Sequence, residues 1–248
     1  MDYKLKTEAC VTYPYKLGNQ TKEITIHYHL IPSHIEHAPM KATAKGNIWE
    51  RKLYNIYHDI LNKPENNFKS AIDVGAYIGT HTLPMGVLAG GRVFAFEANP
   101  EIFDTLKKNV EQLGLETISV SNQLISHHED ELLFYNRSDG TSRISDRHIK
   151  NDYHCWRDTK PLDRCIPECY KDDIALIKID VEGHELQVLK GAKKIIEESR
   201  PIILIEVFKH KLKYILEWAE LNDYDITRLG GEDYQLTPRN TNLQPDSH

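Results

Sequence analysis

The stretch Ala71-Ile72-Asp73-Val74-Gly75-Ala76-Tyr77-Ile78-Gly79-Thr80-His81-Thr82 decides the fold. An apolar run ends in an acidic residue, and two glycines separated by three residues then lead into a helix start. Glycine lets the backbone turn tightly and approach a ligand, and the first turn of a helix presents free N–H groups. This order predicts a nucleotide-type cofactor loop, whose candidate binding residues are Asp73, Gly75, Ala76, Tyr77, Gly79, Thr80 and His81.

The next apolar run, residues 92–96, ends in Glu97 about twenty residues after the loop. A carboxylate in this position can accept two hydrogen bonds from the hydroxyls of a ribose. Pro100 follows at the favoured first position of a helix. We therefore predict that Glu97, Ala98 and Asn99 contact the cofactor.

Two further apolar runs, residues 174–179 and 201–205, also end in acidic residues. A parallel α/β sheet binds its ligands beyond the carboxyl ends of its strands, so these acids are expected at one edge of the sheet. The candidate catalytic residues are Asp180, Glu182, His184 and Glu206. Asp180 is also a candidate cofactor contact because it directly follows the fourth strand.

Four segments together resemble the FkbM family of S-adenosylmethionine-dependent O-methyltransferases: DVGAYIGTHT, FEANP, LIKIDVEGHELQVLKGA and PIILIEV. The resemblance covers roughly residues 47–210 and departs at Tyr77, where the family usually has Asn. It implies a Rossmann-like class I methyltransferase fold of the α/β class, with a seven-stranded, mostly parallel sheet and a C-terminal antiparallel hairpin. It also implies S-adenosylmethionine as cofactor, an adenine pocket bounded by Asn122 and Gln123, and a sugar, glycan or other polyhydroxylated acceptor.

The carboxylates support more than one chemistry. An alcohol must lose a proton when it is methylated, and Asp180 is the first candidate base, followed by Glu182, His184 and Glu206. The same acids can instead bind a divalent cation that acidifies the acceptor hydroxyl. One of them can also simply cap the helix that begins near His184. The sequence leaves these three readings open and assigns no metal ligands.

Two other classes of function compete with a methyltransferase. A nicotinamide-dependent dehydrogenase is disfavoured because the loop lacks the G-x-G-x-x-G spacing and has no glycine at position 77. A non-catalytic binding or scaffold module on the same fold is the second rival, since a fold does not determine a function. The acids kept at the strand ends argue against it, and Tyr77 leaves it open.

We expect residues 1–69 to form a strand hairpin and a covering helix, and residues 70–237 to form the methyltransferase domain. The covering helix is predicted over residues 47–61, with Asn47 as its cap and Glu50 as the capping-box partner. Residues 136–173 form a long polar stretch with arginines and aromatics, which we interpret as an acceptor-binding loop. The tail, residues 238–248, is expected to be disordered.

The 248 residues carry a net charge of −6, with a pI near 6.1. An acidic chain disfavours general nucleic-acid binding. No apolar run approaches the roughly 18 residues that cross a bilayer, and the four cysteines are few for this length. We therefore expect reduced thiols, no membrane insertion and a cytoplasmic protein. The oligomeric state does not follow from the sequence.

Overall fold

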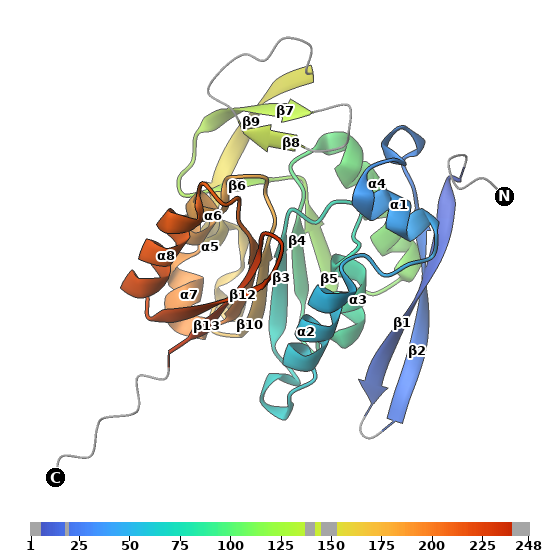
Figure 1. Ribbon diagram of the computed structural model, residues 1–248, viewed down its shortest axis with the longest axis horizontal. Coiled ribbons are helices and arrows are strands. Elements are labelled where there is room, and N and C mark those ends of the chain that lie inside the picture. Colours follow the sequence, from blue (N-terminus) through green and yellow to red (C-terminus); the bar gives the residue numbers. More distant parts are fainter. Residues whose placement is uncertain (1–5, 18–19, 137–141, 145–152, 240–248) are drawn as a thin grey trace.

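A central seven-stranded sheet organises the protein (Figure 1) in a computed structural model that describes residues 6–17, 20–136, 142–144 and 153–239. In spatial order its strands are β12 (Tyr224–Gly230), β13 (Asp233–Pro238), β11 (Ile202–Glu206), β10 (Ile174–Ile179), β3 (Ser70–Val74), β4 (Val93–Phe96) and β5 (Ile118–Ser121). The five strands from β11 to β5 are parallel, whereas β13 is antiparallel to both β11 and β12. The predicted sheet and its C-terminal hairpin are confirmed.

Helices cover both faces of this sheet. One face carries α2 (Arg51–Leu61), α3 (Thr82–Leu88) and α4 (Pro100–Leu113), and the other carries α5 (Leu162–Cys165), α6 (Glu185–Gly191), α7 (Lys193–Ser199) and α8 (Leu212–Leu221). Successive strand residues point to opposite faces of the sheet. Ala71 therefore packs in the apolar core under α2, α3 and α4, and Ile72 packs in the core under α5 to α8. Strands buried on both sides need continuous apolar runs, which is why the sequence shows them so clearly.

Helix α4 follows its sequence signals closely. The side-chain oxygen of Asn99 accepts hydrogen bonds from the backbone N–H groups of Glu101 and Ile102, and Pro100 occupies the first turn. Gly114 ends the helix with a φ of 71°, in the left-handed region that glycine adopts without a steric penalty. These signals position the start of the helix directly behind Glu97.

The N-terminal segment forms a hairpin and a short helix beside α4. Strands β1 (Glu8–Leu17) and β2 (Gln20–His29) pair antiparallel, and residues 18–19 of the predicted turn lie outside the described residues. The helix α1 (Ala38–Ala44), which was not predicted from the sequence, follows a 3-10 turn at Pro32–His34. Buried Asn109 of α4 donates from Nδ2 to the backbone oxygens of His29 and Ile78, so it connects the hairpin to the cofactor loop.

The predicted start of the covering helix is wrong. Helix α2 begins at Arg51 rather than at residue 47, and Glu50 before it has a left-handed φ of 45°. The side chain of Glu50 turns inward, where its Oε2 lies 3.0 Å from Nε2 of His81. The backbone N–H of Asn47 bonds to the carbonyl of Ala42 and closes the turn after α1. A tertiary contact has therefore overridden the local capping pattern.

The predicted polar loop contains strands. A second sheet has the order β6 (Leu124–Ser126), β9 (Tyr153–Pro161), β7 (Glu131–Asn136) and β8 (Ser142–Ile144), and it lies over the carboxyl-end side of the main sheet in Figure 1. Residues 137–141 and 145–152 lie outside the described residues. Because β9 exposes much of its length, its sequence lacks the apolar alternation that reveals a half-buried strand.

Two further boundaries differ from expectation. The helix predicted over residues 184–199 is divided at Ala192, whose φ of −104° and ψ of 18° separate α6 from α7. Strand β13 extends to Pro238, and residues 240–248 of the predicted tail lie outside the described residues. Short 3-10 turns at Pro64–Asn66 and Glu168–Tyr170 precede β3 and β10, respectively.

Candidate functional site

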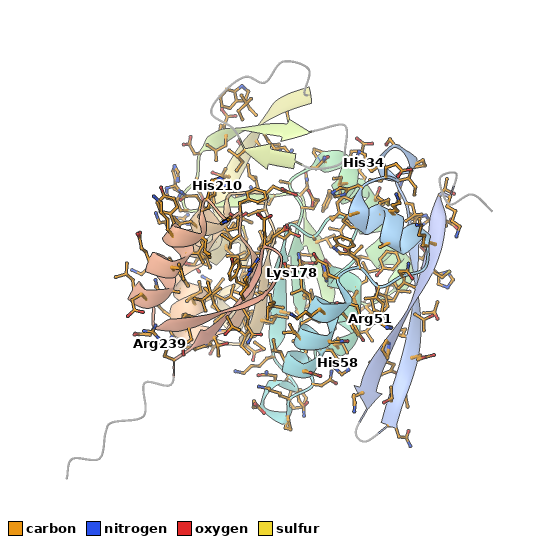
Figure 2. The ribbon with its side chains drawn as sticks, in the orientation of Figure 1. His34, Arg51, His58, Lys178, His210 and Arg239 are labelled. Carbon is orange, nitrogen blue, oxygen red and sulfur yellow. The ribbon has the colours of Figure 1, made fainter. Side chains whose placement is uncertain are left out.

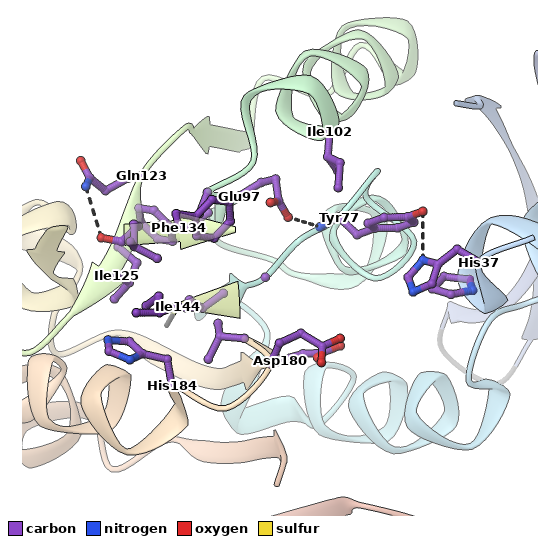
Figure 3. Close-up of a pocket in the computed structure, with 18 residues that line it drawn as sticks. His37, Tyr77, Glu97, Ile102, Gln123, Ile125, Phe134, Ile144, Asp180 and His184 are labelled. Carbon is purple, nitrogen blue, oxygen red and sulfur yellow. Dashed lines mark hydrogen bonds between the residues drawn. The ribbon is translucent and has the colours of Figure 1, made fainter. Parts of the chain in front are cut away.

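A cleft with about 770 Å³ of empty volume lies at the carboxyl ends of β3, β4 and β10. His37 and Tyr77 stand at one end and Gln123 and His184 at the other, with Glu97 between them (Figure 3). Its lining residues are His37, Pro39, Val74, Gly75, Tyr77, Phe96, Glu97, Ala98, Ile102, Gln123, Leu124, Ile125, Phe134, Ile144, Asp180, Val181, Glu182 and His184. The wall is therefore largely apolar, with Glu97 facing Asp180 across the cleft.

Gly75 allows the cofactor loop to pass against the end of β10. Its φ is 86°, and a Cβ at this position would lie only 1.7 Å from the backbone oxygen of Asp180. The N–H groups of Gly75 and Ala76 both donate to the carbonyl of Phe96, which fixes the loop to β4 as well. Only glycine meets both the conformation and the space at this crossing.

Glu97 is a buried carboxylate held by backbone donors. Its Oε2 accepts from the N–H of Tyr77 at 2.9 Å and its Oε1 accepts from the N–H of Asn99 at 2.8 Å. Burial raises the pKa of Glu97 to about 7, and the two backbone hydrogen bonds act in the opposite direction. Each oxygen keeps a further lone pair, so the side chain can still accept hydrogen bonds from a ligand in the cleft.

Tyr77 occupies an unusual backbone position, with a φ of 53°. Its hydroxyl lies 3.1 Å from Nδ1 of His37, and the two rings meet edge to face at 5.2 Å. Burial raises the pKa of the Tyr77 hydroxyl above its usual value, so it is neutral at physiological pH. Through its contact with His37, Tyr77 thus connects the loop after β3 to the N-terminal segment.

Asp180 and Glu206 form a carboxyl pair beside a buried lysine. Nζ of Lys178 donates to Oδ2 of Asp180 at 3.1 Å. Burial alone would raise the pKa of Asp180, but the Lys178 ammonium and a hydrogen bond with Glu206 hold it below its usual value. The Asp180 carboxylate, together with burial, raises the pKa of Glu206 well above its usual value. At neutral pH, Glu206 therefore carries the proton that the pair shares.

Glu206 does not reach the main cleft. It lies behind Asp180 on a smaller cavity of about 190 Å³, which Asp180 also lines. Glu50, Lys178 and Asp233 contribute to the same cavity. Burial raises the pKa of Asp233 to about 6. Of the four predicted catalytic residues, Asp180, Glu182 and His184 line the cleft, and Glu206 contacts it through Asp180.

His184 is a neutral residue at one end of the cleft. Its Nε2 lies 3.0 Å from Oγ of Ser126. Burial lowers the pKa of His184 to about 4, and the positive charges of Lys211, His127 and His128 add to this effect. The imidazole is therefore uncharged at neutral pH.

Several predicted cofactor residues support the loop from behind. Oδ2 of Asp73 accepts from the Thr82 hydroxyl at 2.6 Å, and His81 faces Glu50. Asn99 serves as the cap of α4. The predicted cofactor-binding residues that do not line the cleft are Asp73, Ala76, Gly79, Thr80, His81, Asn99 and Asn122.

Asn122 and Gln123 lie at the end where an adenine pocket was predicted. Nδ2 of Asn122 donates to the backbone oxygen of Glu97, and its Oδ1 accepts from Arg157 at 2.6 Å. Asn122 therefore holds the backbone of Glu97 and does not line the cleft. Gln123 lines the cleft while its Nε2 donates to the carbonyl of Asp158 at 2.7 Å.

Lining residues from two distant segments were not predicted from the sequence. His37 and Pro39 come from the N-terminal segment, and Phe134 and Ile144 come from the second sheet. No local motif marks them, because they reach the cleft only through long-range packing. Ile102 was identifiable in principle, since it points inward from the first turn of the helix that Pro100 opens.

Among the described residues, no group of three or more His, Cys, Asp or Glu side chains has an arrangement that can hold a metal ion. In that same part of the chain, no helix has the length and apolar character needed to cross a membrane.

Comparisons with known proteins place this geometry in context. The family model described as "Methyltransferase FkbM domain" matches residues 73–226. Hexuronic acid methyltransferase AglP from Haloferax volcanii is 29% identical over 178 residues, which are 70% of this chain and 66% of AglP. A crystal structure of methyltransferase FkbM from Methylobacillus flagellatus has a TM-score of 0.51 at 21% identity, covering 68% of this chain and 44% of that one. The chain thus spans less than two thirds of either relative and shares the methyltransferase fold.

Proposed function

Because the chain belongs to the FkbM methyltransferase family, we propose that it uses S-adenosylmethionine to methylate an oxygen of a sugar or sugar-acid acceptor. The observation that carries the proposal is Glu97, a buried carboxylate that two backbone N–H groups hold at the cleft wall. Its oxygens suit the two hydroxyls of a ribose. Asp180 lies across the same cleft, at the end of the strand next to the cofactor loop.

The lining of the cleft suggests how S-adenosylmethionine would lie in it. Glu97 and Ala98 would hold the ribose, and the apolar side chains of Leu124, Ile125 and Phe134 would enclose the adenine. Gly75 and Tyr77 would face the methionine portion. When bound, S-adenosylmethionine supplies a methyl group on a positively charged sulfur, which is already a good electrophile.

The residues of this chain then have to orient the acceptor and manage its proton. In methyl transfer the acceptor oxygen would take the methyl group from the sulfur as the carbon–sulfur bond broke, so the residues that line the cleft would have to hold the two in line. A hydroxyl acceptor would lose its proton to Asp180, which is ionised and lines the cleft. Alignment can lower the barrier by roughly 7–11 kcal/mol, and a positioned base adds about 10²–10⁴-fold.

The sugar acceptor is proposed from AglP, whose name gives hexuronic acid as its substrate. The test is isothermal titration of the purified protein with S-adenosylmethionine and with NAD, followed by methyl transfer to sugars and uronic acids. Binding of S-adenosylmethionine and methylation of an acceptor oxygen support the proposal. Binding of NAD instead, or of neither ligand, would contradict it.

A further inference from the structure

The loop from Val207 to Lys211 follows β11 and leads into α8. The rings of Phe208 and His210 stack in it, with centroids 5.9 Å apart and planes inclined by 11°. Phe208, Lys209, His210 and Glu232 line an open depression on the surface. In Figure 2, His210 lies at the upper left of the molecule, far from Arg239 at the lower left. We call these four lining residues the β11–α8 platform.

The platform adjoins the edge of the main cleft. The Phe208 ring lies 3.5 Å from the position that a Cβ on Gly183 would take, and the Lys211 ammonium donates to the backbone oxygen of Gly183. Gly183 stands between Glu182 and His184, which both line the cleft. A ligand on the platform would therefore lie next to the carboxylates at the strand ends.

The platform offers an exposed ammonium group, that of Lys209. Lys209 and His210 are exposed, and neither makes an ion pair with a carboxylate in the described part of the chain. Lys211, next to the platform, donates from Nζ to the backbone oxygen of Gly183. The opposite side of the cleft edge is acidic, with Asp180 and Glu182. Lys209 is thus the group on the platform that favours a ligand with one anionic end, and Glu232 lines the same depression.

Stacked rings and cations together fit one class of ligand. The apolar C–H faces of a pyranose pack well on aromatic rings, because such rings offer a flat, rigid and largely apolar surface. Lysine ammonium groups bind carboxylate or phosphate as point charges. Glu232, which also lines the depression, can accept hydrogen bonds from sugar hydroxyls.

We propose that the β11–α8 platform binds an anionic sugar, stacking its ring on Phe208 and His210 and holding its carboxylate or phosphate with Lys209. This inference rests on the proposed function and adds the acceptor-binding surface and the charge of the acceptor. It places the acceptor beside β11, at the edge of the cleft formed by residues 182–184.

The test uses the full chain with S-adenosylhomocysteine present, and saturation-transfer NMR detects sugar binding. The probes are methyl glucuronide, glucose 6-phosphate and neutral methyl glucoside, so that carboxylate and phosphate are compared separately. The variants are Phe208→Ala and Lys209→Glu. Lys213→Ala is the matched control, because Lys213 is an exposed lysine on α8 whose Nζ lies over the Tyr214 ring instead.

We expect at least one anionic probe to bind at least tenfold more tightly than methyl glucoside. Both platform variants should weaken that binding at least tenfold, and the Lys213→Ala variant should not. Lys209→Glu alters an exposed side chain, so it remains informative if Phe208→Ala fails to fold. Equal binding of neutral and anionic probes, no binding of any probe, or an unaffected Lys209→Glu variant would overturn the inference.

The affinity for S-adenosylmethionine, measured separately by titration, distinguishes this failure from that of the proposed function. A wild-type protein that binds S-adenosylmethionine but shows no platform effect contradicts only the inference. A wild-type protein that does not bind S-adenosylmethionine contradicts the proposed function itself.

Discussion

The backbone N–H of Tyr77 donates to Oε2 of Glu97 at 2.9 Å, which joins the cofactor loop directly to the carboxylate at the end of β4. The two features that first defined the site in the sequence are thus a single hydrogen-bonded unit. A change in the position of the Glu97 carboxylate would therefore also affect the backbone of the loop at Tyr77.

Replacing Glu97 should weaken cofactor binding strongly. Hydrogen bonds to charged groups contribute about 1.5–3 kcal/mol each, so Glu97→Gln should raise the Kd for S-adenosylmethionine by about 10- to 100-fold. Titration calorimetry gives the Kd, and exposed Glu101→Gln in α4 is the control. An unchanged affinity of the Glu97→Gln variant for S-adenosylmethionine would contradict the proposal that Glu97 binds the ribose.

Cofactor affinity should depend on pH because burial raises the pKa of Glu97 to about 7. Below this pH the carboxyl is protonated and loses acceptor capacity, so affinity should increase between pH 6 and pH 8. The Glu97→Gln variant should show no such increase, since it has no proton to lose. A wild-type Kd that stays constant over this range would contradict the assignment.

Alanine substitutions at Gly75 and Gly114 should show how much of the destabilisation comes from steric overlap and how much from backbone strain. Both have positive φ, but a Cβ at Gly75 would overlap the Asp180 carbonyl, whereas a Cβ at Gly114 meets nothing within 4 Å. Gly114→Ala should cost about 1–2 kcal/mol of unfolding free energy. Gly75→Ala should cost about 1–3 kcal/mol more, because the loop must also move. Urea unfolding measures both, and equal losses would show that the overlap is relieved cheaply.

Removing the charge of Lys178 should destabilise the protein in a pH-dependent way. Lys178→Met leaves Asp180 buried without its cation, which typically costs about 3–5 kcal/mol. The pKa of Asp180, now held below its usual value, would rise above it. Stability would then fall as the pH rises through the new pKa, so the loss in Tm should be larger at pH 8 than at pH 5. Equal losses at both pH values would contradict this account.

Asp180 and Glu206 should differ in their effect on turnover. Glu206 holds the shared proton, and Gln can still donate a hydrogen bond to Asp180, so Glu206→Gln should lower kcat by less than about tenfold. Asp180→Asn removes the base itself and should lower kcat by about 10²–10⁴-fold. Steady-state kinetics at saturating cofactor test this, and a Glu206→Gln variant as impaired as Asp180→Asn would shift the base to Glu206.

The central sheet and much of the cleft could be predicted from the sequence for one physical reason. Fully buried parallel strands require unbroken apolar runs, and their carboxyl ends must meet at one edge. Gly75, Glu97 and Asp180 each follow such a run, so the order of residues along the chain already implies that they lie close together.

The features that the sequence did not reveal depend on contacts between distant segments. The sequence predicts Glu50 as a capping-box residue, but its side chain contacts His81 instead of the helix start. Phe134 and Ile144 reach the cleft because β9 pairs with β6 and β7, and nothing near those residues indicates this pairing. Partly exposed strands and inward-facing acids have no local signature that distinguishes them from loops and caps.

His37 and Pro39 line the cleft, although both lie well before residue 73, where the match to the family model begins. The region that the family model matches is therefore shorter than the region whose residues line the cleft. A fragment trimmed to residues 73–226 would keep the residues by which the family is known and lose one wall of its own binding site.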